Sequence, residues 1–137
     1  MNCDTENFPI ASSRESPMKS ISSHVLDGVR GSDATDLRVS AYYLAASGER
    51  RKIAEVRTDM SGRLTIEVDT RDDDSETRYE FVFHGGEYFA EHALHELKSP
   101  IHETVIRLDL SKVEACCHVP IIMSPHTYST WWSSSDR

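Results

Sequence analysis

The sequence lacks the features that mark several large classes of protein. No stretch of it approaches the roughly 20 consecutive apolar residues that a membrane-spanning helix needs, which predicts that no such helix is present. Basic residues are outnumbered, with 15 Lys and Arg against 23 Asp and Glu and a net charge of −8. Because binding to nucleic-acid phosphates needs a basic surface, this balance argues against a nucleic-acid partner.

Cysteine is scarce and unevenly placed. The three cysteines are Cys3, Cys116 and Cys117, whereas a disulfide framework usually shows an even number at wider spacings. Neighbouring residues of a strand point to opposite faces, so Cys116 and Cys117 are not expected to bridge each other. The N-terminus also lacks the basic segment and apolar core that mark a secretory signal. We therefore expect a reducing, cytoplasmic location.

Length and composition suit one domain preceded by a flexible segment. The chain has 137 residues, 38% of them hydrophobic, with six Gly and five Pro. Residues 1–20 are rich in Ser, Asn, Glu and Pro and show no lasting apolar period. A segment of that composition buries too little surface to offset its ordering entropy. We expect a flexible leader over residues 1–20 and a single folded domain over 21–137.

Short alternating segments separated by turn residues predict strands through most of that domain. One segment differs, because Tyr88–Leu97 places apolar residues near helical spacing and stops before Pro100, which predicts a short helix. The pattern as a whole predicts an all-β antiparallel sandwich of about eight strands with one helix. The expected strands open at Val25-Leu26 and continue over 37–44, 52–58, 64–68, 79–83, 104–110, 119–123 and 127–132, the last two joined at 124–126.

Histidine is abundant, with seven in the chain, but few of these residues lie in informative positions. His92 and His95 are three residues apart on the predicted helix, a spacing that can place both on one metal ion. No third ligand follows from the pattern, so a solvated helix face explains the pair equally well. His84 and His102 have no pattern around them and are expected to be surface or loop histidines.

Two histidines and one arginine stand where strands are expected to begin or turn. His24 and His118 each head an apolar run, and Arg63 follows Gly62 at a tight turn. One imidazole can take a proton from water near neutral pH, and a second can orient the water or donate a proton. A guanidinium stays charged and can hold an anionic substrate or an oxyanion. The three residues would form a hydrolytic set, although unrelated polar residues at strand ends fit the spacing as well.

Several motifs, in sequence order, resemble those of the transthyretin-like 5-hydroxyisourate hydrolases. The motifs are Ser-Ser-His-Val-Leu-Asp at 22–27, Gly-Ser at 31–32, Ser-Gly-Arg at 61–63, Glu-Tyr-Phe at 87–89, His-Val-Pro-Ile-Ile-Met-Ser-Pro at 118–125 and Tyr-Ser-Thr at 128–130. The resemblance covers residues 21–132 and implies a transthyretin-like antiparallel sandwich of about seven to eight strands. It also implies a homotetramer, built as a dimer of dimers, with the sites in a cleft between dimers.

The same resemblance implies a reaction and the residues that perform it. The family hydrolyses 5-hydroxyisourate, the product of urate oxidation, to 2-oxo-4-hydroxy-4-carboxy-5-ureidoimidazoline. His24 and His118 match the family's catalytic histidines and Arg63 matches its arginine, whereas Ser134 and Trp132 fall at substrate-binding positions. The resemblance implies neither a metal nor an organic cofactor.

The C-terminus departs from the family pattern, in which Tyr-Arg-Gly-Ser directly follows Tyr-Ser-Thr. Here Trp131-Trp132-Ser133-Ser134 stands in that place and three further residues follow. Two tryptophans favour an alternative, a noncatalytic transthyretin-like carrier whose inter-dimer channel binds a small aromatic ligand. Transthyretin itself has lost the catalytic histidines and arginine, so we rank the hydrolase first. Smaller departures are Asp33 in place of a proline, Ser61 in place of an aspartate and Cys116 in place of a histidine.

Overall fold

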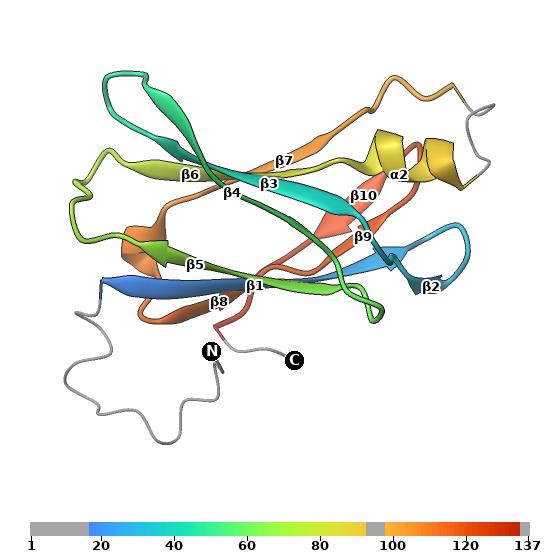
Figure 1. Cartoon of the computed structure of the whole chain (residues 1–137), viewed down its shortest axis with the longest axis horizontal. Coiled ribbons are helices and arrows are strands. Elements are labelled where there is room, and N and C mark those ends of the chain that lie inside the picture. Colours follow the sequence, from blue (N-terminus) through green and yellow to red (C-terminus); the bar gives the residue numbers. More distant parts are fainter. Residues whose placement is uncertain (1–16, 93–97, 135–137) are drawn as a thin grey trace.

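The computed structural model describes residues 17–92 and 98–134 of the chain. These residues form two β-sheets that pack face to face, with one short α-helix at one end of the sandwich (Figure 1). The predicted all-β sandwich is therefore confirmed. Over the described residues, no helix combines the length and the apolar character needed to cross a membrane.

The first sheet contains β1 (Met18–Asp27), β2 (Ser32–Asp33), β5 (Arg63–Asp69), β8 (Cys116–His118), β9 (Ile121–Met123) and β10 (Tyr128–Thr130). Strand β1 lies at the centre of this sheet. On each edge, its first part pairs with one strand and its last part pairs with another. On one edge β5 and then β2 pair with it antiparallel, and on the other edge β8 and then β9 pair with it parallel. Strand β10 pairs antiparallel with β9.

The second sheet contains β3 (Arg38–Leu44), β4 (Arg50–Arg57), β6 (Arg78–Phe83) and β7 (Thr104–Leu108). Its strands are all antiparallel, in the order β4-β3-β6-β7. Helix α2 (Gly85–Glu91) follows β6 directly and packs Tyr88 and Phe89 into the interior. A short 3-10 helix at Leu110–Lys112 follows β7.

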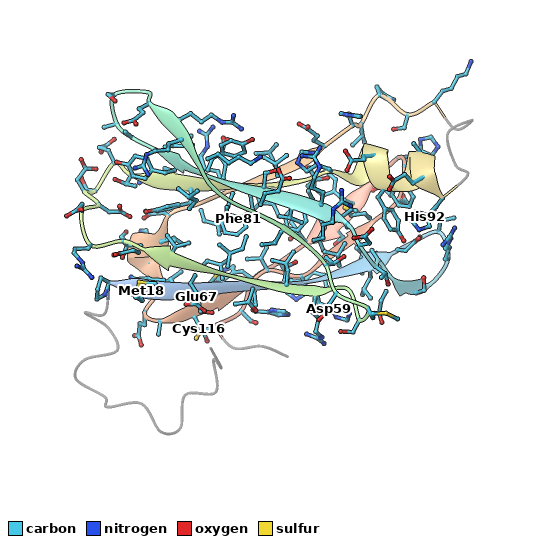
Figure 2. The ribbon with its side chains drawn as sticks, in the orientation of Figure 1. Met18, Asp59, Glu67, Phe81, His92 and Cys116 are labelled. Carbon is cyan, nitrogen blue, oxygen red and sulfur yellow. The ribbon has the colours of Figure 1, made fainter. Side chains whose placement is uncertain are left out.

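Apolar side chains from both sheets fill the space between them. Phe81 of β6 lies between the sheets in Figure 2, and Phe83, Val39 and Ile21 are equally buried. Each such side chain contributes about 1.5–3 kcal/mol by leaving water. Alternate residues of each strand point away from this core. Ser20, Ser22 and His24 of β1, which alternate with Ile21 and Val25, therefore lie on the outer face of the first sheet.

Several predicted element bounds shift for identifiable reasons. Strand β1 begins at Met18 rather than Val25, because polar residues along it are buried and hide the alternation that apolar residues would show. The strand predicted over 119–123 begins only at Ile121, and the separate strand β8 precedes it. Pro120 lies between them and has no N–H for the ladder. The helix begins at Gly85 rather than Tyr88, and residues 93–97 of the prediction lie outside the described residues.

The expectation that Cys116 and Cys117 do not bridge each other is confirmed. Cys117 faces the core as a free, buried thiol, so it does not bridge Cys116. Burial raises the pKa of Cys117 to about 11, which keeps it protonated at neutral pH. Residues 1–16 lie outside the described part of the chain, so the division into leader and domain stays a prediction.

A glycine fixes the turn that leads into β5. Gly62 has φ +75° and lies so close to β1 that an added Cβ would stand 2.6 Å from the Val25 carbonyl oxygen. The Gly62 carbonyl accepts a hydrogen bond from Val25 N–H at 2.8 Å. The turn therefore needs both the left-handed conformation and the missing side chain.

We expect Gly62→Ala to destabilise the fold by about 3 kcal/mol, because it adds a steric clash to the cost of a left-handed alanine. The control is Gly31→Ala, since Gly31 has φ +70° but nothing within 4 Å of the added Cβ. This control should cost about 1 kcal/mol, the conformational part alone. Urea unfolding of the two variants measures the difference, and equal losses would contradict the role of close packing at Gly62.

Candidate active site

The register of β1 brings the three predicted catalytic residues onto one face. His24 lies directly opposite Arg63 of β5, and Ser22 lies opposite His118 of β8. Because Ser22 and His24 are two residues apart on one strand, all four side chains share a face. It is the outer face, since Ile21 and Val25, which point to the opposite side of the strand, are in the core. The set spans three adjacent strands, about 10 Å across.

His24 is held by a carboxylate from the neighbouring hairpin. Its Nε2 lies 2.9 Å from Oδ1 of Asp33, and the His24 side chain keeps 21% of its exposure. Asp33 stands in β2 opposite Leu26, so it reaches His24 from the position diagonally adjacent on the same face. In the sequence Asp33 stands out only as a departure from the family pattern, which does not predict this contact. The two residues are nine positions apart, and no local motif links them.

His118 is deeply buried although it points to the outer face. Its side chain is 2% exposed, and its Nδ1 lies 2.8 Å from Ser22 Oγ. The backbone of Ser133 pairs with that of His118 through hydrogen bonds of 2.8 and 2.9 Å. The C-terminal segment therefore lies beside β8 and forms an isolated antiparallel β-bridge with it, the rung between Ser133 and His118. Trp132 and Ser134, the predicted substrate-binding residues, flank this rung, and both are exposed.

Arg63 follows a turn that is organised by one carboxylate. Asp59 Oδ1 accepts hydrogen bonds from the backbone N–H groups of Arg63 and Ser61 and from the Ser61 hydroxyl, each at 2.9 Å. These bonds, the one from Arg63 first, lower the pKa of Asp59. Asp59 lies at this turn in Figure 2. Serine at position 61 therefore takes part in the turn itself.

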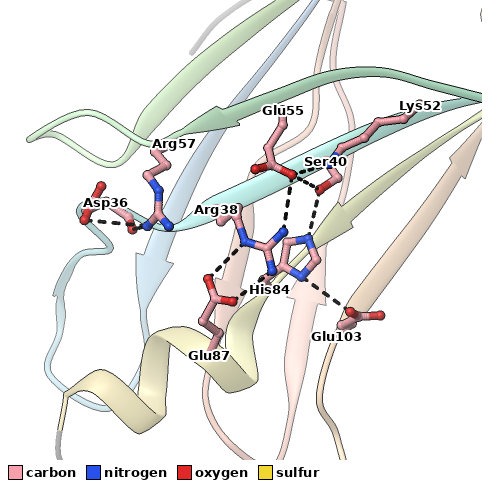
Figure 3. A network of polar contacts seen from close by, with 9 residues as sticks. All are labelled: Asp36, Arg38, Ser40, Lys52, Glu55, Arg57, His84, Glu87 and Glu103. Carbon is pink, nitrogen blue, oxygen red and sulfur yellow. Dashed lines mark hydrogen bonds and ion pairs between the residues drawn. The ribbon is translucent and has the colours of Figure 1, made fainter.

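A second polar cluster lies on the outer face of the second sheet, where the sequence predicted no site (Figure 3). Arg38 bonds Glu87 of α2 at 2.8 Å and Glu55 of β4 at 3.3 Å. His84 Nε2 lies 3.0 Å from Ser40 Oγ, and its Nδ1 lies 3.4 Å from a Glu103 oxygen.

The order Ser40–His84–Glu103 is that of a hydrolytic triad, but the serine is not available for attack. Ser40 is 1% exposed and its hydroxyl donates to Glu55 at 3.2 Å. His84 was expected to be a surface or loop histidine; it lies in the connection between β6 and α2, but it is not at the surface, because it is only 8% exposed. Its hydrogen-bond partner Ser40 is 44 positions away in the chain, so the burial of His84 is a tertiary effect. We assign this cluster to the structure of the sheet.

Of the two histidines three residues apart, His92 and His95, only His92 lies in the described part of the chain. His92 stacks on the Tyr88 ring at a centroid distance of 4.2 Å, and its Nδ1 lies 2.7 Å from the Tyr88 carbonyl oxygen. His95 lies outside the described residues. Over residues 17–92 and 98–134, no group of three His, Cys, Asp or Glu side chains could hold a metal ion.

The two-sheet sandwich, with a polar set of two histidines and an arginine on one outer face, defines a transthyretin-like β-sandwich protein. Residues 21–132 match the model of the HIUase/Transthyretin family, and the chain belongs to that family. The chain is similar to 5-hydroxyisourate hydrolase of Pseudomonas aeruginosa, with 29% identity over 126 residues that cover 90% of this chain and 98% of the relative.

Two further relatives agree with this placement. 5-Hydroxyisourate hydrolase 2 of Rhizobium meliloti is 30% identical over 116 residues, which cover 83% of this chain and 95% of that protein. The solved structure of Klebsiella pneumoniae 5-hydroxyisourate hydrolase has a TM-score of 0.65 at 22% identity, covering 85% of this chain and 99% of that one. At that identity the structural likeness supports the fold.

The buried position of His84 predicts a pH dependence of stability. Desolvation, followed by the nearby positive charge of Arg38, lowers the pKa of His84 below its usual 6.5. The unfolded chain therefore binds a proton at this residue more readily than the folded chain does. Stability from His84 is fully present above pH 6.5 and is lost as pH falls toward the lowered folded value.

We expect the melting temperature of the wild type to fall between pH 7.5 and 5.5, and His84→Gln to reduce that fall. His126→Gln is the control, because His126 is exposed. Calorimetry at the two pH values measures the effect. An unchanged pH dependence in H84Q, or an equal reduction in H126Q, would contradict this assignment.

Proposed function

We propose that the protein is a 5-hydroxyisourate hydrolase that uses His24, Arg63 and His118. The observation that carries this proposal is the register of β1, which sets His24 opposite Arg63 and Ser22 opposite His118 on one face. Family membership and the names of the relatives support it independently. In this reaction water opens a cyclic acyl–nitrogen bond to give 2-oxo-4-hydroxy-4-carboxy-5-ureidoimidazoline.

The reaction needs an activated water, stabilisation of charge on the carbonyl oxygen, and a proton for the leaving nitrogen. His24 and His118 supply the proton transfers, because an imidazole both accepts and donates a proton near neutral pH. Arg63 supplies a fixed positive charge for the electron-rich ring and the developing oxyanion. General acid–base assistance contributes about 10²–10⁴-fold, and one oxyanion donor about 10²–10³-fold.

We also propose an oligomeric state, a metabolic role and a cellular location for the protein. An outer sheet face makes an open site, so a second subunit that covers it would exclude water and complete a cleft. Ile122 and Tyr128 leave apolar surface exposed on the same sheet, which suits a homotetramer with sites between dimers. We place the reaction in purine breakdown and in the cytoplasm, without a metal or organic cofactor.

A carrier function is the second candidate, and the C-terminal segment favours it. Trp131 and Trp132 are 50% and 62% exposed beside the rung formed by Ser133 and His118. Exposed aromatic rings near an inter-subunit channel would suit a small aromatic ligand. The hydrolase ranks first because a carrier has no need of the two histidines and the arginine on one face.

The decisive test is to generate 5-hydroxyisourate with urate oxidase and follow its decay with this protein added. We expect decay much faster than the spontaneous rate, and His24→Asn, Arg63→Ala and His118→Asn should each reduce kcat by about 10²-fold or more. Size-exclusion chromatography controls for an intact assembly. Decay at the spontaneous rate would overturn the hydrolase proposal, and a saturable change in tryptophan fluorescence with aromatic ligands would then favour the carrier.

The changed C-terminus yields a separate prediction on substrate affinity. Trp132→Arg should lower KM for the anionic substrate by about 3–10-fold, because one added positive charge near an exposed site is worth about 1 kcal/mol. Trp132→Gln is the matched control, since it removes the ring without adding charge. The gain should shrink at high salt. An equal change in both variants would mean that the bulk of the ring, rather than its missing charge, sets KM.

A further inference from the structure

We propose that Asp33 is a positioning residue that fixes the protonation pattern of His24, so that Nε2 keeps its proton and Nδ1 is the nitrogen that exchanges protons with the reactants. The inference deepens the proposed function and rests on it for its kinetic consequence. The protonation pattern itself can be observed without any turnover.

The assignment follows from the chemistry of the contact. A carboxylate oxygen only accepts hydrogen bonds, so the 2.9 Å distance between Asp33 Oδ1 and His24 Nε2 requires the proton to be on Nε2. A neutral imidazole has one N–H, which leaves the lone pair on Nδ1. Within residues 17–92 and 98–134, Asp33 is the one group that hydrogen-bonds the His24 ring.

Two independent contacts hold Asp33 where it can do this. Its backbone is in register with Leu26, and the next residue, Ala34, donates its N–H to the Val25 carbonyl at 2.9 Å. The Asp33 Cβ also lies against Gly62, because a Cβ built there would stand 3.2 Å from it. The carboxylate is therefore carried by rigid backbone rather than by a free loop, as a positioning group requires.

The other imidazole of the site is held in the opposite way. Ser22 Oγ engages Nδ1 of His118, whereas Asp33 engages Nε2 of His24. The partners differ in kind as well, because a hydroxyl can donate or accept and therefore does not impose one tautomer. A carboxylate accepts only, so Asp33 fixes the tautomer of His24. The proton-exchanging role falls to His24 Nδ1 for this reason.

In the hydrolytic step, the proton that His24 takes from water is the proton that it later gives to the leaving nitrogen. Nδ1 of neutral His24 takes a proton from the attacking water, which forms the bond from oxygen to the carbonyl carbon. In the resulting imidazolium the proton stays on Nε2 and is donated in a hydrogen bond to Asp33, whose carboxylate stabilises the positive charge. Nδ1 then returns the proton to the ring nitrogen as the carbon–nitrogen bond breaks. Asp33 gains no proton at any step.

The first measurement is the ¹⁵N NMR spectrum of the histidine rings in the wild-type protein at pH 8, with His24→Asn used to assign the His24 signals. We expect the pattern of a neutral ring protonated at Nε2. Asp33→Ala should shift this pattern toward a mixture of the two tautomers. Asp33→Asn should keep it, because an amide oxygen can still accept from Nε2–H.

The second measurement is the steady-state kinetics of the same variants. We expect Asp33→Ala to lower kcat about tenfold with little change in KM, less than the ~10⁴-fold loss at the buried aspartate of a serine protease, because Asp33 is partly exposed. Asp33→Asn should fall between wild type and Asp33→Ala. Asp72→Ala is the charge-matched control on the exposed acidic loop and should leave kcat unchanged.

The outcomes separate the two proposals. A wild-type His24 ring protonated at Nδ1, or an Asp33→Ala spectrum identical to wild type, overturns the role of Asp33 whether or not the protein is active. A wild-type ring protonated at Nε2 in a protein that does not hydrolyse 5-hydroxyisourate supports the positioning contact and overturns the hydrolase. Equal losses of kcat in Asp33→Ala and Asp72→Ala would assign the effect to net charge and would also overturn the positioning role.

Discussion

The hydrogen-bond ladders on the two edges of β1 determine where every residue of the candidate site lies. Buried backbone N–H and C=O groups need partners, so a central strand must be paired along its whole length. Here each edge is shared by two successive strands, β5 then β2 and β8 then β9. The changeovers fall next to His24 on one edge and after His118 on the other. At the changeover beside His24, pairing with β5 ends and pairing with β2 begins, so that Arg63 of one strand and Asp33 of the other both lie next to His24.

Most of the fold could be predicted from the sequence, because strands with apolar alternation report their own burial. The segments around Tyr79–Phe83 and Leu64–Val68 are of this kind, and both became strands of the core. Strand β1 begins well before the predicted point because Ser20, Ser22 and Ser23 are buried, and their pairing partners lie more than forty residues away. Burial of a polar residue is a tertiary property and leaves no local pattern.

The candidate site, too, was predictable in its residue types and not in its tertiary contacts. The types of the site residues and their positions at strand ends indicated proton transfer and anion binding, and the resemblance to a family selected His24, Arg63 and His118. Their juxtaposition could not be derived from spacing, because it depends on the parallel register of β8 and the antiparallel register of β5. The contact of Asp33 with His24 was missed for the same reason. It depends on a hairpin whose second strand has only two residues.

The acidic segment 69–76 interferes little with an anionic substrate at Arg63, because it lies at a distance from that residue. Five of the 23 acidic residues stand in 69–76, which begins at the end of β5 opposite to Arg63. Asp69 is six positions from Arg63 along β5, about 20 Å, which is about twice the Debye length of about 8–10 Å at physiological salt. The charges of this segment are therefore largely screened at Arg63. On that face backbone hydrogen bonds join Ser133 of the C-terminal segment to His118, and such bonds do not depend on which side chains stand at positions 131 and 132.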